Sequence, residues 1–215
     1  MSGGVQYGMG AAPALDLDAQ LMLQVRDGDD DSFRLLLEKH RAPVVRFVYR
    51  MIQDQAVSEE LGQEVFLSIY RARAGYEPAA KFTTWMFRIA SHLALNWLRD
   101  GRNEKKRRVS IDAREGGARA REFPGPEPTV EEHLVQKTRL DEIRQAIARL
   151  PEKQRAAVVM HKYEELEYTQ IAGALGCSEA AVKSLLFRAY QSLRGSLAHL
   201  APGASGSTNE LRGTV

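Results

Sequence analysis

The sequence has very little cysteine and no long apolar run. Cys177 is the only cysteine among 215 residues, which excludes an intrachain disulfide and a cysteine metal cluster. No apolar stretch approaches the ~20 residues that a membrane span needs. Histidines and carboxylates are not spaced as metal ligands, because the carboxylates fall at expected helix starts and caps. We therefore expect a cytoplasmic protein with no metal, no cofactor, no membrane insertion and no enzymatic activity of its own.

The sequence also lacks the alternating pattern of β-strands. Apolar residues recur instead at helical spacing, as at Leu61, Val65 and Ile69. Residues 101–130 break this pattern with charge runs, a Gly-Gly pair and three prolines, which is typical of a linker. The predicted fold is all-α, with two small helical domains joined by a flexible linker. The predicted boundaries are a disordered N-terminus 1–14, a first domain 15–100, a linker 101–130, a second domain 131–200 and a disordered tail 201–215.

Several local features are predicted within the first domain. Ser58 is a plausible helix N-cap, and Thr83 or Thr84 can cap a later helix. Pro43 either kinks or divides the apolar stripe around it. Trp85, Ile89, Leu93 and Trp97 lie four residues apart on one helical face, and we expect Trp97 in the core.

The segment "TQIAGALGCSEAAVKSLLFRAY", residues 169–190, has the spacing of a helix-turn-helix. Ala172 supplies a small residue at the helix crossing, Gly176 a turn residue and Val182 an apolar anchor. The second helix then points polar and basic groups outward, a face that suits phosphates and base edges in a major groove. The predicted DNA-contacting residues are Ser178, Lys183, Ser184, Phe187 and Arg188.

Charge is divided unevenly along the first domain. Residues 16–64 carry eleven acidic and six basic residues, a net charge of −5, whereas residues 71–108 carry three acidic and ten basic residues, a net charge of +7. The basic half also holds a cluster of aromatic residues: Tyr76, Phe82, Trp85, Phe87 and Trp97. Basic residues mixed with aromatics favour binding of single-stranded nucleic acid, where bases stack on rings and phosphates meet cations.

Taken in order, three motifs resemble a known family. "SEELGQEVFLSIYRAR", "FTTWMFRIASHLALNWLRD" and, after a polar linker, "ARLPEKQRAAVVMHKYEELEYTQIAGALGCSEAAVKSLLFRAYQSLR" are similar to the extracytoplasmic-function sigma factors. These are the smallest members of the bacterial sigma-70 family, and the resemblance spans about residues 17–198. It implies a sigma factor that binds core RNA polymerase and directs promoter-specific initiation.

The resemblance also implies roles for particular residues. The helix with Glu60, Leu61, Gln63, Glu64 and Phe66 matches the segment that docks on the β′ clamp helices of polymerase. Residues matching the part that captures the unpaired −10 strand are Phe82, Thr84, Trp85, Arg88 and His92. The helix-turn-helix residues above match positions that contact the −35 duplex. The β flap and an anti-sigma factor are further partners that the family implies.

The sequence departs from the family pattern at several positions, including the start of the recognition helix, where Ala180–Val182 read "AAV" and the family has "GTV". His92 stands where the family has an asparagine beside the pocket for a flipped base, and an imidazole does not offer an amide's paired donor and acceptor. Leu185 and Tyr190 replace family arginines, which predicts fewer phosphate contacts and a shallower salt dependence. The alternative function is a stand-alone helix-turn-helix repressor, which usually dimerises on paired half-sites.

Overall fold

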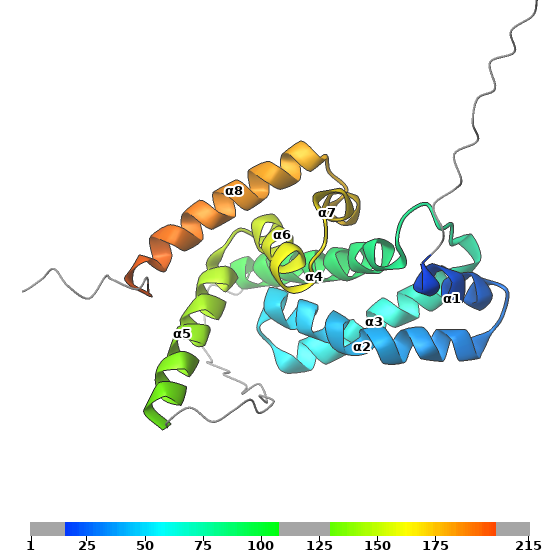
Figure 1. The fold of residues 1–215 in the computed structure, drawn as a ribbon, viewed down its shortest axis with the longest axis horizontal. Coiled ribbons are helices and arrows are strands. Elements are labelled where there is room, and N and C mark those ends of the chain that lie inside the picture. The colour runs from blue at the N-terminus through cyan, green and yellow to red at the C-terminus, as the bar shows by residue number, and fades with distance from the viewer. Residues whose placement is uncertain (1–15, 108–129, 201–215) are drawn as a thin grey trace, which may run out of the picture.

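The computed structural model describes residues 16–107 and 130–200, and its side chains outside 102–135. Every regular element in these two ranges is helical, which confirms the all-α prediction (Figure 1). The predicted segments 1–14 and 201–215 and most of the predicted linker lie outside the described residues. The helices are α1 (Leu17–Arg26), α2 (Asp30–Ile52), α3 (Gln55–Arg71), α4 (Phe82–Arg107), α5 (Val130–Arg149), α6 (Glu152–Tyr163), α7 (Tyr168–Leu175) and α8 (Glu179–Ser196), with 3-10 turns η1 (Arg73–Gly75) and η2 (Ala198–Leu200).

Aspartates start the first three helices. Asp16 accepts a hydrogen bond from the backbone N–H of Ala19 at 2.7 Å, and Asp54 accepts one from Val57 at 3.0 Å. Asp29 caps α2 in the same way. The prediction that Ser58 caps a helix is wrong, because Asp54 takes that position one turn earlier and Ser58 lies inside α3. Carboxylates suit these places because the exposed N–H groups of a helix start favour negative charge.

Two further local predictions differ from the structure. Pro43 lies within α2, which runs from Asp30 to Ile52, so the proline does not divide the apolar stripe, although a kink there stays a prediction. Helix α4 begins at Phe82, so Thr83 and Thr84 lie in its first turn instead of preceding it as caps. At its other end α4 continues to Arg107, seven residues past the predicted end of the first domain.

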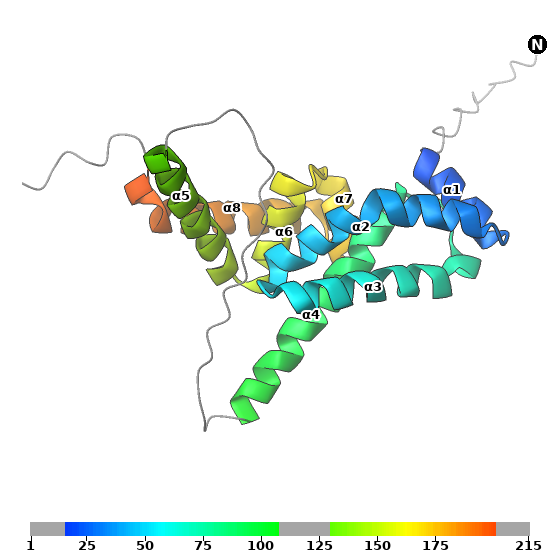
Figure 2. The same cartoon turned by 90° about the horizontal axis from the view of Figure 1, so that it is seen from below.

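Helices α2, α3 and α4 pack together around an apolar core (Figure 2). Phe47 of α2 and Phe87 of α4 meet at its centre, with ring centroids 5.3 Å apart in an edge-on arrangement. The buried stripe of α4 is formed by Phe82, Met86, Phe87, Ala90 and Ala94. Trp97 is 39% exposed, so the prediction that it belongs to the core is wrong. The buried stripe lies next to the stripe of Trp85, Ile89, Leu93 and Trp97 on the same helix. Both stripes are apolar, so helical spacing alone did not show which one is buried.

The helix-turn-helix forms from α7 and α8 as predicted. Gly176 ends α7 with a φ of +61°, in the left-handed region where a side chain is strained. Ala172 is 7% exposed at the helix crossing, and Val182 is fully buried. Ser178 caps α8 by accepting a hydrogen bond from the N–H of Ala181 at 3.2 Å. These contacts fix the angle at which α8 leaves the turn.

The α1–α4 half and the α5–α8 half pack against each other. Helix α7 lies on α4, and α5 and α6 lie on α2, so that one buried apolar cluster includes residues of both halves. Arg155 of α6, 9% exposed, donates a side-chain hydrogen bond to the backbone carbonyl of Met51 in α2. Ser91 of α4 donates a hydroxyl hydrogen bond to the carbonyl of Ala174 in α7, at 3.4 Å. The two halves therefore form one packed body in this structure (Figures 1 and 2).

Candidate nucleic-acid interface

Helix α8 presents a continuous polar and basic face. Lys183, Ser184, Phe187 and Arg188 are all exposed, and Phe187 exposes 66% of its surface. Val182, Leu186 and Ala189 face the core on the opposite side of the helix. This division follows from the helical period, which brings residues three and four apart onto one face. Phe187 adds an exposed apolar ring to this polar and basic face.

Ser178 plays a different part from the other predicted residues of this face. Its hydroxyl oxygen accepts from the N–H of Ala181, so it caps the helix. It lies at the N-terminus of an 18-residue helix, where partial positive charge favours a phosphate. Its position is therefore compatible with a phosphate contact, while its side chain serves the local fold.

Tyr190 of α8 packs inward. Its hydroxyl lies 3.0 Å from Nδ1 of His161 on α6, and burial raises the pKa of Tyr190. The ring of His161 also lies 5.4 Å from that of Tyr168. Tyr190, which stands where the resemblance implies an arginine, therefore connects α8 to α6 through this contact with His161. Sequence reasoning noticed the loss of a cation but missed this packing role, because His161 is 29 residues away along the chain.

Three predicted residues of α4 line one surface hollow of about 280 Å³. Trp85, Arg88 and His92 occupy successive turns of α4. Ile89 and Leu93 of the same helix and Ser68 of α3 complete the lining. The ring of Tyr76 packs against the indole of Trp85, with ring centroids 5.0 Å apart. Burial raises the pKa of Tyr76 to about 12, and the negative charges of Asp16 and Asp18 act in the same direction. An aromatic ring, a guanidinium and an imidazole around one hollow can stack on a base and pair with its phosphate. Ser68 was not predicted from the sequence.

Phe82 and Thr84 do not line this hollow. Phe82 is fully buried, with its ring 5.5 Å from that of His40 and 6.5 Å from that of Tyr76. Thr84 is 7% exposed and faces α7, where its Cγ2 lies 3.2 Å from the position that a Cβ on Gly173 would take. The hydroxyl oxygen of Thr84 is buried and has no hydrogen-bond partner among the described residues. The five predicted residues thus divide into three at the hollow and two in packed positions.

The outer face of α3 carries most of the residues predicted to dock on polymerase. Glu60 and Gln63 are exposed, and Leu61 and Glu64 are half-buried. Phe66 is only 4% exposed and packs into the core in this arrangement. Leu67 was missed, although 48% of it is exposed. It follows Gln63 by four positions, so helical spacing from the predicted residues could have found it.

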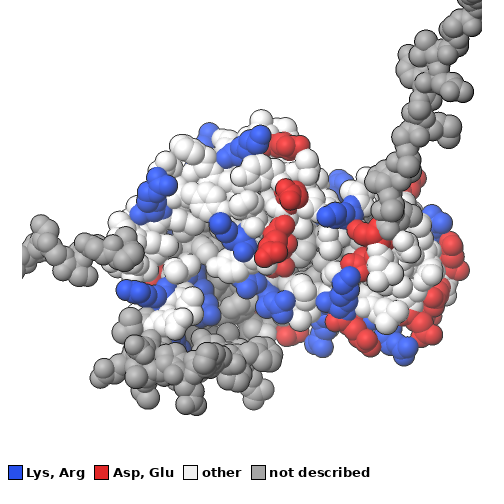
Figure 3. Space-filling view, viewed as in Figure 1, with Lys and Arg blue, Asp and Glu red and all other residues white. Residues whose placement is uncertain are grey.

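Acidic groups gather at the end of the molecule formed by α1 and the start of α2 (Figure 3). Exposed carboxylates there include Asp27, Asp29, Asp30 and Asp31. One acidic side chain is instead buried: Asp18 contacts the amine of Lys39 at 2.6 Å and Nε2 of His40 at 2.9 Å. The basic side chains of α8 lie toward the opposite end.

No group of three or more His, Cys, Asp or Glu side chains in the described ranges could hold a metal ion. No helix in residues 16–107 or 130–200 is long and apolar enough to cross a membrane.

Family models and relatives agree on what this arrangement resembles. Residues 36–104 match the model of sigma-70 region 2, and residues 140–193 match that of sigma-70 region 4. RNA polymerase sigma factor CarQ of Myxococcus xanthus is 31% identical over 83% of this chain and 97% of its own length. The ECF RNA polymerase sigma-E factor of Escherichia coli strain K12 is 31% identical over 82% of this chain and 92% of its own.

Two solved structures have the same fold. The structure of CnrH in complex with the cytosolic domain of CnrY has a TM-score of 0.64, with 17% identity over 86% of this chain and all of that one. The sigma factor RpoE in complex with the anti-sigma factor NepR, from Bartonella quintana, has a TM-score of 0.62, with 17% identity over 77% of this chain and 96% of that one.

These comparisons identify the class as sigma factors of RNA polymerase. The chain belongs to the sigma-70 family, within its extracytoplasmic-function group, as its motifs predicted. The repressor alternative is not favoured, because regions 2 and 4 occur together in one chain and its relatives are sigma factors.

Proposed function

We propose that this sigma factor binds core RNA polymerase through the outer face of α3 and holds a promoter at two places. Trp85, Arg88 and His92 capture an unpaired base of the −10 element, and the exposed face of α8 reads the −35 duplex. Polymerase supplies the catalytic chemistry. The observation that carries this proposal is the hollow on α4, where three residues predicted from sequence meet around one surface depression.

The chemistry of the hollow fits a flipped base. Stacking on an aromatic side chain contributes ~1–3 kcal/mol per base, and the indole of Trp85 is held in place by Tyr76. Arg88 is exposed beside it and can pair with a phosphate. His92 can donate one hydrogen bond and stack, which supports a base preference different from that of an asparagine.

The face of α8 fits the major groove. Lys183 and Arg188 offer cations, Ser184 a hydroxyl, and Phe187 an apolar surface for a thymine methyl group. The N-terminus of α8 adds a phosphate contact near Ser178. These groups are few, so we expect the free protein to bind duplex DNA weakly and to need polymerase for specificity.

The packed arrangement differs from the one that holds a promoter. The −35 and −10 elements are about 25 base pairs apart, roughly 85 Å at ~3.4 Å per base pair. Here α4 contacts α7 and α7 contacts α8, so the axes of α4 and α8 lie within about two helix diameters, on the order of 20 Å. The halves must therefore separate on the promoter, with residues 15–100 and 131–200 as the moving units and residues 101–130 between them.

Thr84 supports this opening. Its buried hydroxyl has no partner among the described residues, a cost of about 1–3 kcal/mol. When α7 leaves α4, that hydroxyl becomes accessible beside Trp85. We therefore keep Thr84 in the proposed −10 surface of the open form, and assign Phe82 and Phe66 to packing that positions their neighbours.

An anti-sigma factor is a further proposed partner. Both solved structures named above are complexes, and the partner in one of them is called an anti-sigma factor. Co-purification from the source cell followed by mass spectrometry tests this partner. Recovery with polymerase subunits alone would count against it. We also expect this chain to act in the cytoplasm, where polymerase is found.

Run-off transcription with core polymerase across a promoter library tests the function. Added protein is expected to start transcription at a defined set of promoters, and His92→Asn and Lys183→Ala are expected to shift −10 preference and weaken −35 dependence, respectively. Initiation that does not change when the protein is added would refute the proposal. Tight, sequence-specific binding in gel shifts without polymerase would also contradict it.

A further inference from the structure

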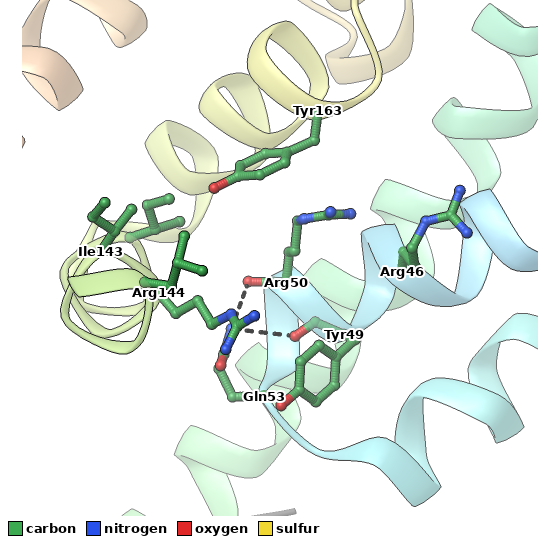
Figure 4. A pocket seen from close by; sticks show the side chains of 9 residues that line it. Arg46, Tyr49, Arg50, Gln53, Ile143, Arg144 and Tyr163 are labelled. Atoms are coloured by element: carbon green, nitrogen blue, oxygen red, sulfur yellow. Dashed lines mark hydrogen bonds between the residues drawn. The ribbon is translucent and has the colours of Figure 1, made fainter. Parts of the chain in front are cut away.

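A second hollow, of about 250 Å³, lies where the two halves of the protein meet (Figure 4). Helix α2 contributes Arg46, Tyr49 and Arg50, while α5 contributes Leu140 and Arg144 and α6 contributes Tyr163. No residue predicted to bind DNA or polymerase lines it. Because its walls come from both halves, this pocket exists only in the packed arrangement.

The lining of this pocket has an excess of positive charge. Three arginines and no carboxylate line it. Arg50 lies 3.6 Å from Glu164, and Arg144 lies 2.7 Å from Asp141, so two of the three cations have an acidic partner. Arg46 makes no ion pair with the side chains that the structure describes. Its charge acts on Glu164 without an ion-pair contact, so its guanidinium remains available to an anion at the pocket.

Arg50 is the most enclosed of these cations. Its guanidinium stacks on the ring of Tyr163, with Cζ 4.1 Å from the ring centroid. Burial lowers the pKa of Arg50, the charges of Glu164 and Tyr163 raise it, and the charges of Arg46 and Arg144 lower it by a smaller amount. The arginines thus repel one another across the pocket. A bound anion would relieve this repulsion, and arginine is well suited to phosphate groups.

The pocket also has apolar surface at its mouth. Leu140 is 39% exposed and Tyr163 is 41% exposed, and both are among the few large apolar side chains that the described residues leave in water. A mixed lining of aromatic, aliphatic and guanidinium groups is typical of sites for organic anions. A simple inorganic ion would leave this apolar surface uncovered.

We propose that this pocket binds a small phosphorylated organic molecule, whose phosphate pairs with the arginines and whose apolar part covers Tyr163 and Leu140. Bound there, the molecule bridges α2 to α5 and α6 and stabilises the packed arrangement. If the proposed function holds, the molecule also lowers the fraction of protein open for polymerase and promoter. The binding step itself does not depend on that function.

Isothermal titration of the full chain with ADP and with inorganic pyrophosphate tests the site. We expect ADP to bind more tightly than pyrophosphate, and Arg46→Gln and Arg144→Gln each to weaken ADP binding at least fivefold. Arg34→Gln is the matched control, because Arg34 is an exposed arginine of α2 outside the pocket. Circular dichroism confirms that each variant remains helical.

Three results would overturn the proposal: no binding of either probe, equal ADP binding by the pocket variants and wild type, or an equal loss in Arg34→Gln. Run-off transcription with the nucleotide substrates alone, and no added ADP, reports on the proposed function separately. A protein that drives transcription but binds neither probe refutes the pocket alone. A protein that binds ADP through Arg46 and Arg144 but drives no transcription refutes the function alone.

Discussion

The side chain of Arg155 in α6 donates a hydrogen bond to the main-chain carbonyl of Met51, in the last turn of α2. The same guanidinium reaches the carbonyls of Ala148 and Leu150 at the end of α5, the latter at 3.2 Å. Carbonyls in the last turn of a helix have no partner within it. One buried arginine therefore satisfies the ends of two helices that belong to different halves of the protein.

Replacing this arginine is expected to loosen the contact between the halves. Arg155→Met keeps the length of the side chain and removes its donors, which leaves buried carbonyls unpaired at a total cost of about 2–4 kcal/mol. Urea unfolding followed by circular dichroism measures the loss. Arg149→Met, at an exposed position of α5, is the control and is expected to change stability little. Similar midpoints for the two variants would contradict the anchoring role of Arg155.

The two tryptophans of the chain make a matched pair. Trp85 lines the hollow on α4, whereas Trp97 is exposed three turns later on the same helix. Trp85→Ala is expected to reduce open-complex formation roughly tenfold or more, since stacking on one base contributes ~1–3 kcal/mol. Trp97→Ala should leave it near the wild-type level. Permanganate footprinting of the melted strand measures both, and equal losses would argue against a role for the hollow.

The face of α8 predicts a distinct response to salt. Lys183→Ala and Arg188→Ala are each expected to weaken holoenzyme binding to a −35 element and to reduce the slope of log affinity against log salt by about 1. Arg194→Ala is the control, because this exposed arginine lies on the same helix beyond the proposed face. Fluorescence anisotropy at several salt concentrations gives the slopes. A slope that changes only in the control would place the DNA elsewhere.

Gly173 offers a way to force the two halves apart. A Cβ at this position would lie 3.2 Å from Cγ2 of Thr84, so Gly173→Leu is expected to push α7 away from α4. Leucine is also a better helix former than glycine, so α7 itself should persist. Energy transfer between dyes on α1 and α8 should fall, and polymerase affinity should rise. Gly195→Leu, with open space around its Cβ, should change neither.

Buried His40 predicts a loss of stability in mild acid. Burial lowers its pKa, against the raising effect of neighbouring Asp18. The folded protein therefore binds a proton less readily than the unfolded chain, whose histidine titrates near 6.5. The stabilisation is fully present above that value and is lost as the pH falls toward the folded pKa. Urea midpoints between pH 7.5 and 5.5 should decline, and His40→Gln should show a flatter decline; an equal slope in both would assign the effect to other groups.

Local patterns in the sequence predicted the helical fold and the helix-turn-helix well. The helix-turn-helix is recognised from a small residue at Ala172, a left-handed turn residue at Gly176 and an apolar residue at Val182. All three lie within eleven consecutive residues. The exposed face of α8 followed from the same periodicity. Such features depend on neighbours along the chain, so a single sequence is enough to identify them.

Features that depend on distant contacts were missed. The buried state of Phe82 and Thr84 is set by His40, Tyr76 and Gly173, which come from three different segments. The link between Tyr190 and His161, and the reach of Arg155 to Met51, likewise join residues far apart in sequence. Helical spacing alone also placed Trp97 in the wrong stripe, because two adjacent stripes of α4 are both apolar.

Neighbouring residues of α4 have two different roles. Trp85, Arg88 and His92 face the hollow, while Thr84 and Ser91, only one residue away from two of them, face α7. Two genetic selections should therefore recover mutations at different codons within the short part of the gene that encodes α4. Mutants chosen for a changed promoter choice would carry lesions at the first set of codons. Mutants chosen for weaker contact between the two halves would carry them at Ser91, whereas changes at Thr84 would affect both properties.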